Sequence, residues 1–191
     1  MSDFEYLTVL IAIILGIGIA HLLMSLGRIL GDTRRLKISV AHLIWTANIL
    51  TFMVVFWWWG ISLRELHEWV FLQYFFLLVD TSLWCLMAAL LYPVAIPKGY
   101  DLKEHFAEKR KVFFSILIVL AFTDPLTSMM LGTEHLIDLG WGYLHWVVAC
   151  LIGGILAFRY ENERVQQAVA IYWGLSTIVA VLAWQFSVVT S

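Results

Sequence analysis

The chain has 191 residues, of which 62% are hydrophobic and 14% are charged, with a net charge of −2 and a mean hydropathy of +0.86. Soluble domains average about 45–50% apolar and about 25% charged residues, so this composition predicts a polytopic membrane protein surrounded by lipids. The balanced charge speaks against a nucleic-acid partner. Cys85 and Cys150 both lie inside apolar segments, which offers no disulfide framework.

Six apolar segments are long enough for the ~20 residues that a helix needs to cross a bilayer. Backbone groups have no water partners in lipid, so such segments must be helices. The sequence therefore predicts an all-α, six-helix transmembrane protein with a single domain over residues 1–191. The predicted spans are Tyr6–Leu30, Ile38–Leu63, Trp69–Tyr92, Val112–Leu131, Trp141–Phe158 and Val165–Val189.

The basic residues predict the orientation of these helices. With the N-terminus outside, 11 of the 12 Lys and Arg residues fall on the cytoplasmic side, and only Arg64 falls outside. Cytoplasmic loops carry an excess of Lys and Arg, so we expect both termini to be periplasmic. The cytoplasmic set is Arg28, Arg34, Arg35, Lys37, Lys98, Lys103, Lys109, Arg110, Lys111, Arg159 and Arg164.

The longest connection, Pro93–Lys111, contains its own helix signal. Asp101 followed by Glu104 is typical of a helix N-terminus. Leu102 and Phe106 then share a face opposite the charged residues. We expect a short cytoplasmic amphipathic helix, partly at the membrane surface, that leads into the fourth membrane helix.

Small residues recur every four positions on the first and fifth segments, which is typical of close helix–helix contacts. Such rows also leave a homo-oligomer open. The first row is Thr8, Ala12, Gly16 and Ala20, and the second is Ala149, Gly153 and Ala157.

Two aspartates fall where hydrocarbon is expected. Asp124 lies about 18 Å along the fourth segment and Asp80 about 16 Å along the third, at ~1.5 Å per residue. An intramembrane carboxyl group should face the bundle interior or water and have a partner. We therefore expect Asp80 and Asp124 to face one shared space and to titrate as a coupled pair.

We expect other polar residues to join this layer. Asn48 lies at similar depth on the second segment, Gln73 shares the Asp80 face, and Thr127 and Ser128 share the Asp124 face. Carboxylate, hydroxyl and carbonyl oxygens suit a proton or a hard cation. The alternative is that each aspartate is protonated and only bonds a neighbouring backbone group.

Histidines suggest weaker sites. His21, on a face with Gly18, Ser25 and Arg28, could relay protons or simply bond a neighbouring helix. Histidine with carboxylates is also a metal-binding combination, for which His135, Asp138 and His145 are weak candidates. No metal motif is present, so the expectation is that no metal binds.

Three consecutive tryptophans, Trp57–Trp59, end the second segment. Successive side chains on a helix point about 100° apart, so the three cannot all face lipid. We expect at least one to pack inside or to line an outer vestibule.

The absent motifs narrow the function. No lysine lies inside a helix, and no catalytic triad, phosphate loop or haem-type cysteine pair is present, which favours a protein that is not an enzyme and has no cofactor. His21 and His42 are the only pair suited to a bis-histidine haem. Three hypotheses remain: a transporter or channel for protons or small cations that uses Asp80 and Asp124, a non-catalytic assembly or lipid-binding scaffold, and a haem- or quinone-binding redox protein.

The chain also resembles a widespread family of small bacterial inner-membrane proteins. The resemblance rests on Glu5-Tyr6-Leu7, the Gly16 and Gly18 pair, Leu22-Leu23, Arg28 and the tryptophan cluster that ends the second segment. It covers about the first half of the chain. It implies a bacterial inner membrane but no activity and no site residues.

Overall fold

The computed structural model describes residues 3–31, 37–65, 69–95, 100–130 and 132–190, with the backbone alone at residues 3, 61–62, 65, 133–136, 138 and 184–190. Each of the six α-helices in these ranges is long and apolar enough to cross a membrane. The predicted all-α, six-helix bundle is therefore confirmed. The elements are α1 Asp3–Gly31, α2 Val40–Trp59, a 3₁₀ helix η1 Gly60–Glu65, α3 Phe71–Leu91, α4 Leu102–Met130, α5 Thr133–Arg159 and α6 Glu163–Thr190.

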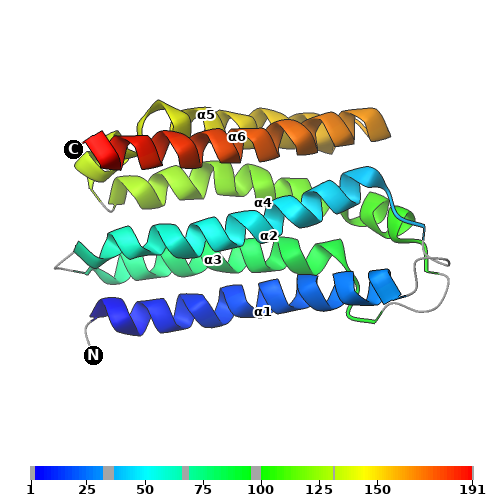
Figure 1. The fold of residues 1–191 in the computed structure, drawn as a ribbon, viewed down its shortest axis with the longest axis horizontal. Coiled ribbons are helices and arrows are strands. Elements are labelled where there is room, and N and C mark those ends of the chain that lie inside the picture. The colour runs from blue at the N-terminus through cyan, green and yellow to red at the C-terminus, as the bar shows by residue number, and fades with distance from the viewer. Residues whose placement is uncertain (1–2, 32–36, 66–68, 96–99, 131, 191) are drawn as a thin grey trace.

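The helices form two groups of three. α1 packs on α3 and α2, whereas α5 packs on α4 and α6, and the two groups meet where α3 contacts α4 and α2 contacts α6. Both termini lie at one end of the bundle (Figure 1). We call it the terminal end, and we call the opposite end, where α1, α3 and α5 finish, the basic end.

Helix α4 starts at the basic end and differs from the prediction. It is one continuous helix from Leu102, so the expected amphipathic helix is its first turns. Asp101 Oδ1 accepts the Glu104 N–H at 3.0 Å, as the N-cap signal predicted. This hydrogen bond, helped by Lys37, holds the pKa of the Asp101 carboxyl below its usual range.

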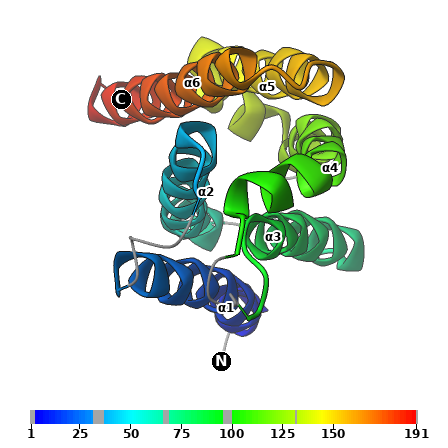
Figure 2. The ribbon, with the colours of Figure 1, turned by 90° about the vertical axis from the view of Figure 1, so that its right-hand side faces the viewer.

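The first turns of α4 lie across the basic end of the bundle (Figure 2). Leu102 and Phe106 are buried, and the Phe106 ring stacks on His42 with 5.3 Å between centroids. The apolar face of this segment therefore packs on protein. The start of α2 and the end of α3 cover this face, and a position of the segment at the membrane surface stays a prediction.

The small-residue rows have different outcomes. On α5, Ala149 and Ala157 are buried and a Cβ added at Gly153 would lie 3.1 Å from Val169 of α6, so this row makes the predicted contact. On α1, a Cβ at Gly16 would meet nothing within 4 Å. The α1 prediction is wrong: Gly18 is the glycine that packs there, against Met53 of α2.

Large apolar side chains are exposed on the outside of all six helices. Each helix contributes at least one whose exposed fraction lies between 45% and 61%. Soluble monomers rarely expose contiguous apolar surfaces of this extent, because water disfavours them. The surface composition is thus that of a multi-pass membrane protein. Examples from α1 to α6 are Ile17, Val54, Leu86, Val119, Ile152 and Ile178.

Candidate functional site

Asp80 is held between α3 and α4. Its side chain is 1% exposed, and Oδ2 accepts the hydroxyl of Thr127 at 2.6 Å. The Thr123 hydroxyl lies beside the Asp80 carboxyl group. The position of this hydroxyl does not meet hydrogen-bonding geometry, so Asp80 Oδ1 and Thr123 Oγ1 are both buried without a partner. A buried carboxyl oxygen without a donor is costly, which marks this position as unusual within the core.

Two acceptor oxygens lie within hydrogen-bonding distance of the Thr127 hydroxyl. Its Oγ1 lies 2.6 Å from Asp80 Oδ2 and 2.9 Å from the backbone oxygen of Thr123. A hydroxyl carries one hydrogen, so it donates fully to only one of the two oxygens. A proton shared between Asp80 and Thr127 would allow both short contacts. The geometry therefore suits a proton-holding group.

Asp124 is held between α4 and α5. Its Oδ2 accepts the hydroxyl of Tyr143 at 2.6 Å, and Ser128 Oγ lies 3.3 Å from the same Tyr143 oxygen. No other hydrogen bond to Asp124 is formed within the described residues. Pro125, which follows, has no N–H for the Ala121 carbonyl, so the helix is weakened at this point.

The two carboxyl groups are neighbours, but they do not share one pocket. The two are close enough to interact electrostatically. Thr127, which bonds Asp80, lies one turn from Asp124 on α4. Each has its own hydroxyl donor on the next helix, and only Asp124 lines the cavity described below. The expectation of a single shared space is therefore corrected to two adjacent hydrogen-bonded sites.

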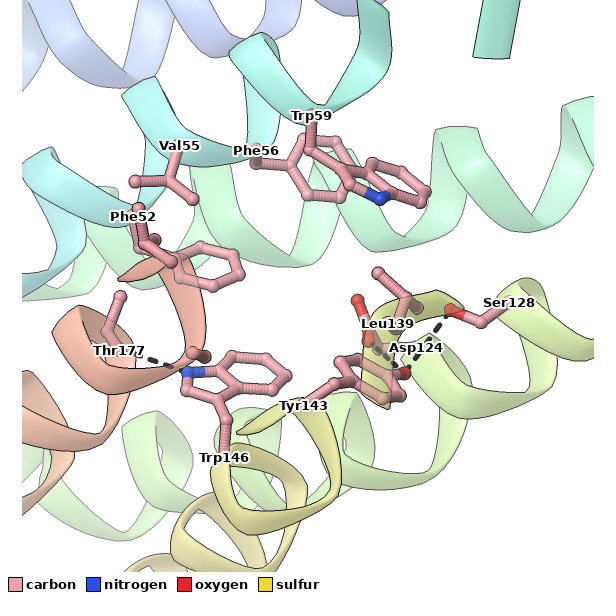
Figure 3. Close-up of a pocket in the computed structure, with 12 residues that line it drawn as sticks. Phe52, Val55, Phe56, Trp59, Asp124, Ser128, Leu139, Tyr143, Trp146 and Thr177 are labelled. Atoms are coloured by element: carbon pink, nitrogen blue, oxygen red, sulfur yellow. Dashed lines mark hydrogen bonds between the residues drawn. The ribbon is translucent and has the colours of Figure 1, made fainter. Parts of the chain in front are cut away.

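A partly open cavity of about 90 Å³ lies beside Asp124, between α2 and the three helices α4, α5 and α6. Asp124, Ser128 and Tyr143 form one side of it, and aromatic rings of α2 face them (Figure 3). It lies toward the terminal end, because its lining includes Trp59 at the end of α2. The lining residues are Phe52, Val55, Phe56, Trp59, Asp124, Ser128, Leu139, Tyr143, Trp146, Thr177, Ala180 and Val181.

Aromatic side chains fill the bundle between this cavity and the basic end. Trp45, Trp84 and Trp173 are fully buried inside the bundle, and the centroid of the Phe52 ring lies 4.0 Å from that of Trp84. Phe113 and Phe114 of α4 pack edge-on against Trp45. The interior between the two aspartates and the basic end is therefore densely packed with rings.

Asn48 and Gln73 lie away from the carboxyl pair. Asn48 Nδ2 donates to the Ala170 carbonyl of α6 at 2.7 Å, so it faces α6 and not Asp80. Gln73 accepts the N–H of Val70 at the start of α3 and donates to the Met130 carbonyl at the end of α4. Both side chains join helices, and the expectation that Asn48 lies near Asp80 is wrong.

The histidines also join elements. His21 Nε2 donates to the Tyr92 carbonyl at 3.1 Å, as the alternative to a proton relay predicted. The His42 ring is fully buried and packs against the rings of Tyr92 and Phe106, at 4.7 and 5.3 Å between centroids. His145 Nε2 lies 3.2 Å from Ser176 Oγ of α6.

The structure tests the metal candidates only in part. The side chains of His135 and Asp138 lie outside the described residues, and among those described no three His, Cys, Asp or Glu side chains come together as metal ligands.

Sequence reasoning missed Tyr143, which donates to Asp124. A tyrosine near the start of an apolar helix carries no signal of which neighbour it faces. By contrast, the tryptophan triplet gave usable information: Trp59 lines the cavity, which confirms that at least one of the three faces inward.

The fold and the site together define a multi-pass helical membrane protein with one buried acid, Asp80, and a second, Asp124, that lines a cavity. Comparison of the chain with family models, with curated proteins and with solved structures gave no match. The bacterial family that the sequence resembles therefore stays an expectation.

Proposed function

We propose that this protein lies in the bacterial inner membrane with both termini in the periplasm, and that it transports protons or small cations through Asp124 and Asp80. The orientation rests on the basic residues, 11 of which fall in or close to the connections on the side opposite the termini. The function rests on one observation: a fully buried carboxyl group, Asp80, lies next to a second, Asp124, that lines a cavity.

The contacts link the cavity to Asp80. A cation or proton that enters the cavity meets Asp124 and Tyr143. Thr127 lies one turn from Asp124 on α4, on the side toward the terminal end, and contacts Asp80, whose Oδ1 has room for a proton because it has no donor. Acidic groups in such a series are typical of intramembrane proton relays.

A transporter fits this arrangement better than an open channel. The rings of Trp45, Trp84 and Trp173 separate Asp80 from the basic end, so passage requires helices to move. The cavity lies between the two groups of three helices, where rocking of one group against the other would expose it to either side. Pro125 supplies a weak point in α4 for such a motion.

The two other hypotheses make different demands. A scaffold would need the helix contacts but not the carboxyl groups, so it predicts normal function in Asp80→Asn and Asp124→Asn. A bis-histidine haem would need a nitrogen of His21 and one of His42 free to ligate iron, whereas His21 Nε2 bonds the Tyr92 carbonyl and the His42 ring is fully buried against Tyr92 and Phe106. A colourless purified protein would dispose of haem.

Flux into proteoliposomes tests the proposal. Vesicles that contain the purified protein and a pH-sensitive dye are given a proton or cation gradient, and the rate of internal pH change is measured. We expect Asp80→Asn and Asp124→Asn to remove most of the protein-dependent rate. Glu104→Gln, an exposed acid at the start of α4, is the matched control and should keep it. Unchanged flux in both Asn variants would remove the two aspartates from the function.

A further inference from the structure

We infer that the cavity between α2 and α5 binds a small organic cation with an ammonium head group. This inference deepens the proposed function, on which it rests, by naming the class of substrate that Asp124 receives. It follows from the rings that line the cavity, from its single carboxyl group and from its size.

Aromatic rings form opposite walls of the cavity. Phe52, Phe56 and Trp59 come from α2, and Tyr143 and Trp146 come from α5 (Figure 3). The Phe52 and Trp146 rings stack on each other at one side of the cavity, at 6° with 5.0 Å between centroids, and Tyr143 stacks on Trp146 at 22°. Ring faces carry a negative quadrupole, so a cation that enters this aromatic lining is attracted by the faces that it can reach.

The only formal charge in the cavity is negative. Asp124 is its one ionisable acid, and no Lys, Arg or His is among its lining residues, all of which are described. An ionised carboxyl group in apolar surroundings is stable only with a partner, and one hydroxyl bond from Tyr143 does not neutralise it. A cation supplied from outside the chain would serve as that partner.

An organic cation fits this lining better than an inorganic one. A hard cation takes about six or more oxygen ligands in place of its water. Besides the Asp124 carboxyl group, the side chains that line the cavity offer only the hydroxyl oxygens of Ser128, Tyr143 and Thr177, and the Thr177 oxygen already accepts from Trp146 Nε1. An alkylated ammonium group needs one counter-ion and ring faces, and both are present.

The size of the cavity agrees with a head group rather than a single ion. Its volume of about 90 Å³ well exceeds the ~10–15 Å³ that one water molecule requires. A trimethylammonium group, a compact body with a diffuse charge, would occupy it with its methyl groups against the rings.

A pair of probes that differ only in charge provides the test. Choline and its neutral isostere 3,3-dimethylbutan-1-ol have the same shape, with N⁺ replaced by carbon. Binding of each to the purified full-length protein in detergent is measured by titration calorimetry. We expect choline to bind at least tenfold more tightly than the neutral alcohol.

Three variants locate the binding. Asp124→Asn should remove the preference for choline over the alcohol. Trp59→Leu keeps the carboxyl group but removes a ring from the wall, and should weaken choline binding about two- to thirtyfold, the range of cation–π contacts from exposed to desolvated sites. Trp57→Leu, two residues earlier and outside the cavity lining, is the matched control and should bind choline as the unmodified protein does.

The outcomes separate this inference from the proposed function. Equal binding of the two probes, or choline binding that Asp124→Asn and Trp59→Leu leave intact, would overturn the organic-cation site. Loss of flux in Asp80→Asn together with absent choline binding would overturn only the substrate class. Choline binding with flux that is unaffected by Asp80→Asn would support the site and overturn the transport path.

Discussion

At the scale of single residues, the contact between Thr127 and Asp80 joins α3 and α4 inside the bundle. Both side chains are buried, and within the described residues this 2.6 Å hydrogen bond is the only one formed to Asp80, with the Thr123 hydroxyl beside it in poorer geometry. Removing the Thr127 hydroxyl would leave the Asp80 carboxyl group with only the poorly oriented Thr123 hydroxyl. The cost of such a buried unsatisfied group greatly exceeds the cost of losing an ordinary hydroxyl bond.

Thr127→Val should therefore lower the free energy of unfolding by about 1–3 kcal/mol. Thr81→Val is the matched control, because Thr81 is equally buried but its hydroxyl bonds only the Leu77 carbonyl of its own helix. Unfolding in mixed detergent micelles would measure both variants. Equal losses in the two would show that Asp80 does not depend on Thr127.

At the scale of the helices, glycine positions distinguish packed faces from lipid-facing ones. A Cβ at Gly174 of α6 would lie 2.6 Å from Asn48 Oδ1, on a side chain that is already held by its bond to Ala170. A Cβ at Gly16 of α1 would meet nothing within 4 Å. The same substitution at these two positions should therefore have opposite effects.

Gly174→Ala should lower the free energy of unfolding by about 1–3 kcal/mol, because overpacking displaces Asn48 from α6. Gly16→Ala should leave it unchanged or raise it by up to about 1 kcal/mol, because alanine is the better helix former. Thermal unfolding of both variants in detergent checks the pair. A loss at Gly16 equal to that at Gly174 would reveal a partner surface on α1, such as a second copy of the chain.

A further element-scale contact fixes α4 against α5. The Arg110 guanidinium, 3% exposed, donates to the carbonyls of Ala157 and Phe158 and to the Glu161 carboxylate, at 2.6–2.7 Å. These carbonyls belong to the last turn of α5, where helices leave their acceptors unpaired. Arg110 thus caps α5 from α4. This joins at the basic end the two helices that present Asp124 and Tyr143 to each other further along.

At the scale of the whole molecule, an even number of helices places both termini at one end of the bundle (Figure 1). The basic residues then determine which side of the membrane that end faces. We expect a reporter that works only in the periplasm to be active when it is fused after Ser191. We expect a second reporter that works only in the cytoplasm to be active when it is inserted between Tyr160 and Asn162. A cytoplasmic signal from the Ser191 fusion would overturn the proposed orientation.

The sequence alone determined the class and the helices of this protein. Apolar runs of about 20 residues are sufficient to predict membrane helices because lipid leaves the backbone no other way to form its hydrogen bonds. Local signals were also reliable: Asp101 caps α4, and the spacing of Trp57–Trp59 required one ring to face inward. These features depend on residues near one another in the chain.

Only the tertiary structure decided which faces meet. The sequence placed Asp80, Asp124 and Asn48 at similar depths, but depth along a helix does not give its rotation or its neighbours. α6 lies beside α2 and takes Asn48, α4 brings Thr127 to Asp80, and α5 brings Tyr143 to Asp124. The order of helices around the bundle results from packing between segments far apart in the chain. No local pattern encodes that packing.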